Sequence, residues 1–481
     1  METLQRTANR GSVSTGFEVG NSSLFEADDS SYIRFTNIST YYSSARAKKF
    51  SNSIWIKQTE LGKTNTMVLS YAANGYLEFT STGELKFIMA FRSGSSGSGT
   101  QKQLKSTASF RDTSAWYHIV VAVDTAQSTA ADRVKVYVNG VQITDWATEQ
   151  YPDQNDESAN VYEQHNYIGT WGGGNHTNTG FCGYVAEFYF LSEIAASPTD
   201  FGEFNSNGIW IPKLYTGTIT SPSSYLNFSN ASNLAEATSG QDWASGNVNS
   251  VAQATDTCTN NFCTFNPVTI SPSNLLTLSE GATQINRITT AKWNTPCSNT
   301  INVNKGKWYG EFQVGNSITM IGVGIVSVFE NTAHGSTTGP GQDESGINSG
   351  VSYYGADGKK FVGGVGSSYG SSYSSSDIIG IAMDLDNNKV YFAKNNTWQN
   401  SGDPTSGATG TGAIDLNPAG EYFFMTINGN STGQTHKANF GGYTTISISS
   451  SASDANGHGV FEYAPPSGYF ALCTKNLAEF G

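Results

Sequence analysis

The sequence predicts an all-β protein built from two β-sandwich domains. A chain of 481 residues is too long for one hydrophobic core, so two units of roughly 200 residues each are expected. Its 52 glycines, 24 tyrosines and 26 phenylalanines, with only 14% charged residues, are typical of short strands joined by tight turns. Helical patterns are nearly absent, because the best candidate, residues 191–196, lasts about one turn.

The first strands are predicted from alternation of apolar and polar residues, which is the pattern of a half-buried strand. Segments of this kind occur at 32–35, 53–57, 76–79 and 85–89. The turn residues Ser-Thr-Gly at 81–83 separate the last two segments, which indicates a hairpin.

Two longer motifs follow. AWYHIVVAVD at 115–124 predicts a strand, and RVKVYVNG at 133–140 predicts a strand that enters a hairpin. In the second motif the valines share one face because side chains alternate along a strand, and Asn-Gly is the strongest short hairpin signal. YIG at 167–169 and GYVAEFYF at 183–190 complete the predicted pair of sheets.

These pieces resemble the laminin-G-like, or concanavalin A-like, jelly roll. The hallmarks of that family are a W-x-H-I/V strand, a V-x-V/L-Y-V-N-G hairpin and a closing I-G…G-x-V/I-x-E/D segment, and all occur here in order within residues 22–215. The resemblance implies the fold. It does not select a ligand, because the fold hosts lectins, glycosidases, adhesins and structural modules.

Polar segments flank this domain. Residues 1–21 form a polar N-terminal arm with Arg6 and Arg10, which is too polar to fold alone and is expected to order on a partner. Residues 216–250 are expected to be a polar linker that contains one short strand at 225–228.

The second unit is assigned to residues 251–481, and several of its motifs occur in a characteristic order. They are GKWYGEF at 306–312, ITMIGVGIV at 318–326, DIIGIAMDLD at 377–386, VYFAKNN at 390–396 and ANFG at 438–441. Over residues 290–470 this order resembles the SPRY fold, a bent β-sandwich whose loops at one end grip peptides or other partners. The usual Asn-Gly after the fourth motif is Asn395-Asn396 here, which leaves the local turn open.

The combination of both domains, with DTCTNNFCTFNP at 256–267 between them, resembles a class of bacteriophage virion proteins described as tail-fibre or surface proteins. The resemblance implies a virion surface protein, a tail-fibre or receptor-binding component that contacts host surface polysaccharide or a protein receptor. The alternatives are a capsid decoration or connector protein and a secreted lectin-like binding protein. The N-terminal arm is expected to contact other virion proteins, and a homotrimer is expected in the particle.

The net charge and the hydropathy of the sequence argue against two kinds of partner, nucleic acids and membranes. The net charge is −13, and the sign is uneven, because residues 1–140 hold 15 Lys and Arg against 11 Asp and Glu. Binding of nucleic acid through a general basic surface is therefore not expected. No stretch approaches the roughly 18 apolar residues of a membrane span, so membrane insertion is not expected. The first six residues lack the apolar core of a secretory signal, which favours synthesis in a host cytoplasm.

The sequence does not predict an enzyme. The E-x-D-x-x-E strand of concanavalin A-like glucanases is absent, and serine, histidine and aspartate residues share no nucleophile spacing. Asp384 and Asp386 lie at a structural position of the SPRY resemblance.

Two loops are candidate binding sites. WGGGNHTN at 171–178 places Trp171, Asn175 and His176 in a glycine-rich loop, which suits stacking on a sugar ring; the alternative is that Trp171 caps the edge of the sandwich. The second set is rich in tyrosine, serine and glycine, the composition of adaptable binding loops, and core packing is the alternative for some of its tyrosines. Its members are Tyr353, Tyr354, Asp357, Tyr369 and Tyr373.

No cofactor is expected. Calcium is conceivable because some laminin-G-like modules bind it through loop carboxylates, with Asp28, Asp29 and Asp124 as candidates, but it is not favoured. The five cysteines have no metal-site or disulfide spacing and are expected to be mostly buried thiols.

Overall fold

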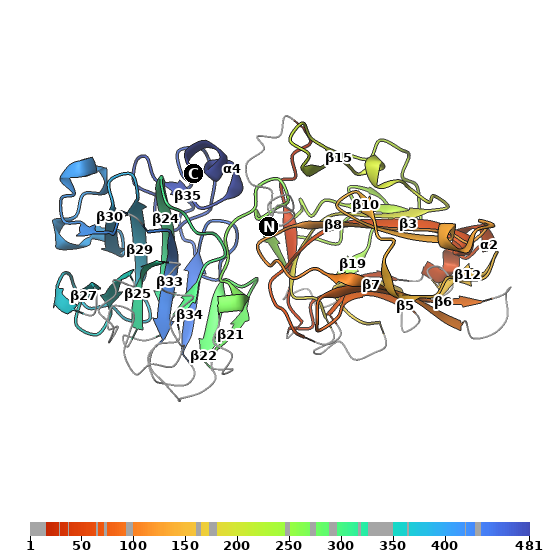
Figure 1. Ribbon diagram of the computed structural model, residues 1–481, viewed down its shortest axis with the longest axis horizontal. Helices are drawn as coiled ribbons and strands as arrows, with labels where there is room; N and C mark the ends of the chain where they lie inside the picture. Colours follow the sequence, from red (N-terminus) through yellow and green to blue (C-terminus); the bar gives the residue numbers. More distant parts are fainter. Residues whose placement is uncertain are drawn as a thin grey trace. The chain divides into compact units, whose positions relative to one another are not determined.

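The computed structural model divides into two compact units, residues 1–261 and 262–481, which are described separately (Figure 1). The structure describes residues 16–481 except for a set of short segments and one longer one. These are 28, 37, 64–65, 72–74, 93–99, 160–164, 173–179, 246–250, 270–275, 288–295, 316–318, 326–349, 363–364, 419 and 429–433. Most of the predicted N-terminal arm, residues 1–15, therefore lies outside the described residues.

The first unit is a sandwich of two antiparallel sheets. Sheet A has the strand order β10 (Val141–Gln142), β9 (Val134–Val138), β8 (Tyr117–Asp124), β3 (Lys49–Gln58), β14 (Gly183–Ser192), β1 (Ser22–Phe25) and β20 (Ala252–Ala254), and β14 also pairs with β17 (Ser224–Leu226), which pairs with β18 (Ser239–Gly240). Sheet B has the order β11 (Trp146–Glu149), β7 (Thr100–Ser109), β6 (Glu84–Arg92), β5 (Gly75–Phe79), β4 (Thr66–Tyr71), β13 (His165–Ile168), β2 (Ile33–Thr36) and β19 (Ala244–Ser245), and β12 (Glu157–Ser158) pairs with β6.

The core of this unit lies between the two sheets, and Figure 1 shows β3 and β8 of sheet A stacked over β5, β6 and β7 of sheet B. Alternation along each strand supplies the core residues. In β9, Val134 and Val136 are buried in the core while Lys135 points to the other face, as the motif predicts. Asn139 and Gly140 both have positive φ, at 48° and 78°, and these angles fit the predicted hairpin turn.

The described part of the predicted linker (216–250), residues 216–245, is built into the first unit in the structure. Its residues form β17, β18 and β19, and Trp243 is buried in the core. Tyr225 on β17 stacks on Tyr189 of β14 with ring centroids 4.2 Å apart and donates a hydrogen bond to Glu187 at 2.6 Å. This range reads as a linker in the sequence because its strands are only two or three residues long, and long-range pairing with β14 and β2 is what orders them.

The first unit also extends past the predicted boundary at residue 250, because Asp256 is held by buried partners. Its carboxylate lies 2.7 Å from the Nζ of Lys57 on β3 and accepts a hydrogen bond from the indole of Trp116 at 3.1 Å. The end of the arm is held in the same way, since the backbone of Val19 exchanges hydrogen bonds with the Thr259 hydroxyl. Residues 16–21 and 251–261 therefore belong to the first unit.

A short hairpin covers the outer face of sheet A. It consists of β15 (Gly202–Phe204) and β16 (Trp210–Pro212). Trp210 of this hairpin and Trp55 of β3 stack on the buried ring of His118, at centroid distances of 5.9 and 4.8 Å. The indole N–H of Trp210 donates to His118 Nδ1 at 3.0 Å, so the ring proton is on Nε2, which donates to the Ser53 hydroxyl at 2.8 Å.

We expect His118 to make the first unit less stable in acid. Burial lowers the pKa of His118 from 6.5 to about 3. The unfolded chain therefore binds one more proton than the folded chain between these values, and the stabilisation present above pH 6.5 is lost as the pH falls, by about 1.4 kcal/mol per unit. Urea unfolding at pH 7 and pH 5 should show this loss in the wild type and a smaller loss in His118→Gln. A His458→Gln control should keep the wild-type slope, and equal slopes for His118→Gln and the wild type would contradict the prediction.

The second unit is also a two-sheet sandwich, and a SPRY-like arrangement was predicted for it. Sheet C has the order β21 (Leu276–Ser279), β22 (Gln284–Arg287), β34 (Thr435–Asn439), β24 (Lys307–Val314), β29 (Ile378–Asp384), β30 (Lys389–Lys394) and β31 (Thr397–Trp398), with β32 (Ile414–Asp415) on β30 and β35 (Phe470–Ala471) parallel to β24. Sheet D has the order β23 (Pro296–Ser298), β33 (Tyr422–Asn428), β25 (Thr319–Ile325), β26 (Gly350–Tyr354), β27 (Lys359–Val362) and β28 (Val365–Ser368).

A buried carboxylate organises the centre of this unit. Glu311 on β24 is fully buried, and its oxygens accept hydrogen bonds from the backbone N–H groups of Glu462 and Tyr463 at 2.9 and 2.8 Å. The side chains of Asn439 and Tyr309 donate to it at 3.0 and 3.2 Å. Burial raises the pKa of Glu311, and these donors oppose that shift. The glutamate of the GKWYGEF motif thus fastens the C-terminal segment to the sheet.

Helices are short throughout the described residues. The α-helices are α2 (Ser44–Lys48) and α4 (Thr474–Phe480), and the 3-10 turns are η1 (Ile38–Tyr41), η2 (Ala130–Asp132), η4 (Pro198–Asp200), η5 (Pro267–Thr269), η6 (Gln399–Ser401) and η7 (Pro404–Thr409). In the part of the chain that the structure describes, no helix has the length and hydropathy to cross a bilayer.

Candidate functional site

The outer face of sheet B carries a row of polar and aromatic side chains. Leu77 and Phe79 of β5 are in the core, so Tyr76 points to the opposite face, and the same alternation places Arg34, Ser70 and Tyr167 on that face. The strand register joins these four side chains in the order Arg34, Tyr167, Ser70 and Tyr76. Neighbouring strands are about 4.8 Å apart, so the two tyrosines flank Ser70 on adjacent strands.

The segment that contains Trp171 is fastened to the middle of this row. The Ser70 hydroxyl donates to the carbonyl of Thr170 at 2.8 Å and accepts from the N–H of Gly172 at 3.0 Å. Residues 170–172 are therefore bound to the outer face at Ser70, between the positions of Tyr167 and Tyr76. Trp171 is half-buried. The sequence left two roles open for Trp171, a stacking residue in a binding loop and a cap on the edge of the sandwich, and its role as a binding residue stays a prediction.

Charged groups border the aromatic row. The Nζ of Lys86 lies 5.2 Å from the ring centre of Tyr76 and pairs with the carboxylate of Glu78. On the other side, burial raises the pKa of Tyr167, and the positive charge of the neighbouring Arg34 partly opposes that rise. Tyr167 and Glu78 are buried, at 5% and 4% exposure, whereas Tyr76, Lys86 and Arg34 are half-buried. The accessible aromatic face of this row is therefore that of Tyr76, and aromatic rings with polar groups beside them are typical elements of ligand sites.

Two of the predicted loop residues, Asn175 and His176, lie outside the described residues. Sequence reasoning missed Tyr76, Tyr167 and Arg34. A signal for Tyr76 was present, since this tyrosine occupies a polar-face position in an alternating strand. Its neighbours across the sheet depend on strand order and register, which local patterns do not reveal.

The tyrosine-rich set in the second unit is mostly core, which corrects the expectation that it forms a binding loop. Tyr353, Tyr369 and Tyr373 are 0%, 7% and 2% exposed. Their rings pack on one another, with centroids 5.6 Å apart for Tyr353 and Tyr369 and 4.9 Å for Tyr353 and Tyr373. Burying these large rings stabilises the unit more than exposing them would. Tyr354 is half-buried and Asp357 is exposed, with Lys359 2.6 Å from the Asp357 carboxylate.

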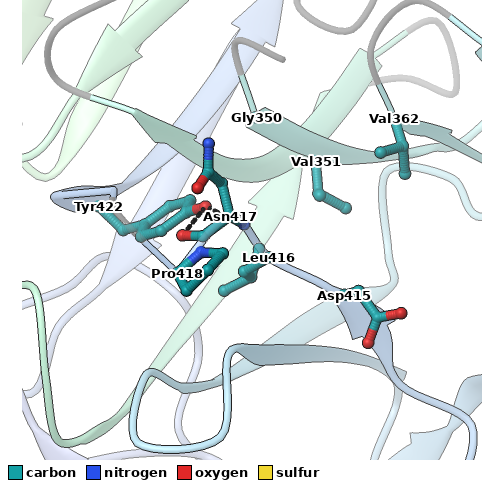
Figure 2. Close-up of a pocket in the computed structure, with 8 residues that line it drawn as sticks. All are labelled: Gly350, Val351, Val362, Asp415, Leu416, Asn417, Pro418 and Tyr422. Carbon is teal, nitrogen blue, oxygen red and sulfur yellow. Dashed lines mark hydrogen bonds between the residues drawn. The ribbon is translucent and has the colours of Figure 1, made fainter.

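The second unit also contains an open pocket of about 390 Å³ (Figure 2). Gly350, Val351 and Val362 of sheet D form one side, and residues 415–418 face them. The Tyr422 hydroxyl is engaged by the backbone of Asn417, donating to its carbonyl at 3.1 Å and accepting from its N–H at 2.7 Å. The lining is mainly apolar, and the exposed carboxylate of Asp415 lies at its rim and pairs with Lys389.

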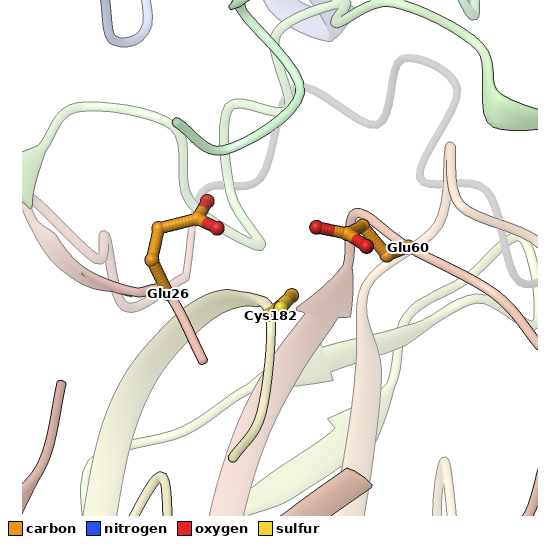
Figure 3. Close-up of side chains that lie close together, drawn as sticks. All are labelled: Glu26, Glu60 and Cys182. Carbon is orange, nitrogen blue, oxygen red and sulfur yellow. The ribbon is translucent and has the colours of Figure 1, made fainter. Parts of the chain in front are cut away.

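One group of potential metal ligands occurs among the described residues. The ligand atoms of Glu26, Glu60 and Cys182 lie within 4.8 Å of one another, and the two carboxylates point toward each other above the sulfur (Figure 3). The Nζ of Lys63 lies 2.6 Å from Glu60 and 3.7 Å from Cys182 Sγ, so a cationic side chain already balances part of this charge. Burial, reinforced by the two carboxylates, raises the pKa of the Cys182 thiol, which favours its neutral form.

The predicted calcium residues are not part of this group. Asp28 lies outside the described residues, and Asp29 is exposed. Asp124 lies 3.2 Å from the Nζ of Lys49 and accepts hydrogen bonds from Gln127 and from the N–H of Ala126. Its carboxylate is thus engaged within its own turn.

Several solved structures resemble part of the chain. The TRIM65 PSpry domain is 13% identical, with 37% of this chain and 92% of that chain covered and a TM-score of 0.28. The SPRY domain of human HERC1 is 13% identical, with coverages of 36% and 96% and a TM-score of 0.27. Stonustoxin is 14% identical, with coverages of 37% and 27% and a TM-score of 0.27. A comparison with curated proteins found no match.

Family comparison assigns both units. Residues 27–199 match the concanavalin A-like lectin/glucanases superfamily. Residues 307–441 match the SPRY domain. The two matches confirm the predicted order of folds, and each falls within one of the two compact units. The chain therefore contains a concanavalin A-like domain, matched over residues 27–199, followed by a SPRY domain, matched over residues 307–441.

Proposed function

We propose that the protein is a non-enzymatic binding protein whose first unit binds a glycan on the outer face of sheet B. The observation that carries this proposal is the row of Arg34, Tyr167, Ser70 and Tyr76, with the backbone on either side of Trp171 hydrogen-bonded to Ser70. The half-buried rings of Tyr76 and Trp171 offer apolar faces to the C–H face of a sugar, whereas Tyr167 is buried and supports the face from within the sheet. The neighbouring Arg34, together with Lys86 and Glu78, supplies donors and acceptors for hydroxyl groups.

We further propose that this binding takes place on the surface of a bacteriophage particle, in a tail-fibre or receptor-binding component. The sequence resemblance of the combined domains to phage virion proteins supports this placement. In this proposal residues 1–15 contact other virion proteins, and three copies assemble in the particle. There are two alternatives. A capsid decoration or connector protein would belong to the particle without binding a glycan, and a secreted lectin would bind a glycan without belonging to a particle.

Loss of Trp171 or Tyr76 is expected to weaken glycan binding strongly. An aromatic side chain at the centre of a binding site typically contributes about 2 kcal/mol, so Trp171→Ala and Tyr76→Ala should each weaken binding roughly 30-fold. The full chain and its variants would be tested on an array of bacterial surface polysaccharides. Phe204→Ala is the matched control, because Phe204 is 54% exposed on the hairpin that covers the other sheet.

Binding of Trp171→Ala at wild-type strength, with unchanged thermal unfolding, would exclude the proposed site. If the wild type bound no polysaccharide, the decoration or connector alternative would be favoured. Gold labelling of intact virions, read together with copy number in a reconstructed particle, tests the placement. Absence from the particle, or single copies or dimers in it, would contradict the corresponding part of the proposal.

A further inference from the structure

Strand β28, residues Val365–Ser368, is the last strand of sheet D. It pairs with β27 on one side, and among the described residues no strand pairs with its other side. All four residues, Val-Gly-Ser-Ser, are exposed. Edge strands expose backbone N–H and C=O groups that can pair with another chain, and proteins usually block them with charges, proline or bulges. Strand β28 has none of these.

A different edge strand of this protein, β11, is protected against pairing with a further strand. Strand β11 at the edge of sheet B shifts register between Trp146 and Thr148 and ends at the exposed charge of Glu149. A bulge and a charge are two of the usual means of preventing strand addition. Strand β28 therefore differs from β11, because it lacks features that prevent another strand from pairing with it.

A row of valines connects this open edge to the pocket of Figure 2. Val351 pairs with Val362, and Val362 pairs with Val365, so the three side chains share one face across β26, β27 and β28. Val351 and Val362 line the pocket. Exposure rises along the row, from 3% at Val351 to 70% at Val365. The apolar wall of the pocket thus continues to the edge and ends at an exposed valine.

The charge beside the edge is positive. Lys359 and Lys360 of β27 lie opposite Ser368 and Ser367, and as consecutive residues they point to opposite faces of the sheet. The Nζ of Lys359 contacts Asp357, and that of Lys360 lies 5.9 Å from the ring centre of Tyr369. A strand added to β28 would have a lysine on each of its faces two strands away, across β28, within reach of a long acidic side chain.

We propose that β28 is a docking site for an extended segment of a partner protein, which adds to sheet D as a further strand. The segment places an apolar side chain beside Val365, in line with the pocket, and carries acidic residues that complement Lys359 and Lys360. The main-chain hydrogen bonds supply affinity, while the valine row and the lysines select the side chains. This site is independent of the glycan site proposed for the first unit.

The test uses the full chain, labelled with a fluorophore, and short immobilised peptides in which valine alternates with glutamate, lysine or serine. We expect the valine–glutamate peptides to bind. Val365→Asp should weaken their binding about tenfold or more, because it removes apolar contact and adds repulsion. Val268→Asp is the control, since Val268 is a valine of the same unit with 69% exposure and the variant has the same net charge.

Strand addition is separated from side-chain binding by methylating the peptide nitrogens at alternate residues. One methylation pattern blocks the edge that faces β28 and should abolish binding, whereas the other should preserve it. Equal binding by both patterns, equal binding by Val365→Asp and Val268→Asp, or no binding by any valine–glutamate peptide would overturn the proposal. The proposal would also be overturned if the wild type bound no peptide but associated with itself and Val365→Asp abolished that association. In that case β28 would pair with a second copy of this chain.

Discussion

Replacing Glu311 by alanine is expected to lower the free energy of unfolding of the second unit by about 4 kcal/mol. The substitution leaves the N–H groups of Glu462 and Tyr463 and the amide of Asn439 without their acceptor. Each buried donor that loses its partner costs about 1–3 kcal/mol. The removed side chain also leaves a cavity beneath the C-terminal segment.

Calorimetry should show a melting transition lowered by about 10 °C, and hydrogen exchange should show faster exchange at the amides of residues 462 and 463. Glu479→Ala, which removes an exposed carboxylate of the same unit, should leave both measurements within experimental error. Unchanged protection of the two amides in Glu311→Ala would show that the glutamate does not hold this segment.

Replacing Lys57 by methionine is expected to destabilise the first unit by about 3–5 kcal/mol. The side chains of Lys57 and Asp256 are 0% and 1% exposed, and their charged atoms lie 2.7 Å apart. Methionine fills most of the space of the lysine, so the main effect is an uncompensated carboxylate in the interior. The Trp116 indole, which donates to the same carboxylate, cannot balance its charge.

A double-mutant cycle separates the ion pair from the packing. Asp256→Asn in the Lys57→Met background should recover much of the loss, because the neutral amide no longer requires a counter-charge. Urea unfolding of the wild type, the two single variants and the double variant gives the coupling energy. A cost below about 1 kcal/mol for Lys57→Met would mean that water or other groups solvate Asp256 in the folded chain.

Local patterns in the sequence predicted the all-β class, and the resemblance of its longer motifs to two families implied the order of the folds. Alternation in segments such as 133–140 reflects the two faces of a strand, and this property belongs to a few consecutive residues. The Asn-Gly turn at 139–140 is equally local, because it depends on backbone angles that few residues adopt. The family matches to residues 27–199 and 307–441 confirm the two domains that these motifs predicted.

The extent of the first unit could not be predicted in this way. Residues 216–250 are polar and contain only very short strands, so their sequence resembles a linker. Residues 216–245 are ordered by distant partners, as the stacking of Tyr225 on Tyr189 and the burial of Trp243 show. Asp256 belongs to the first unit for the same reason, since its partner Lys57 is far away in the chain.

The candidate binding residues also show which properties follow from local sequence and which depend on the tertiary structure. Glycine, serine and tyrosine around Tyr353 and Tyr369 have the composition of a binding loop, yet the tyrosine rings are buried against one another. Composition shows which residue types a segment contains. Whether their side chains are exposed depends on which other residues the fold packs against them. The sequence alone determined the strands, turns and domain order, because these follow from neighbouring residues. Only the tertiary structure decided that Tyr76, Ser70 and Tyr167 lie side by side on one face of sheet B with residues 170–172 bonded to Ser70, because strand order and register join residues that are distant in the chain.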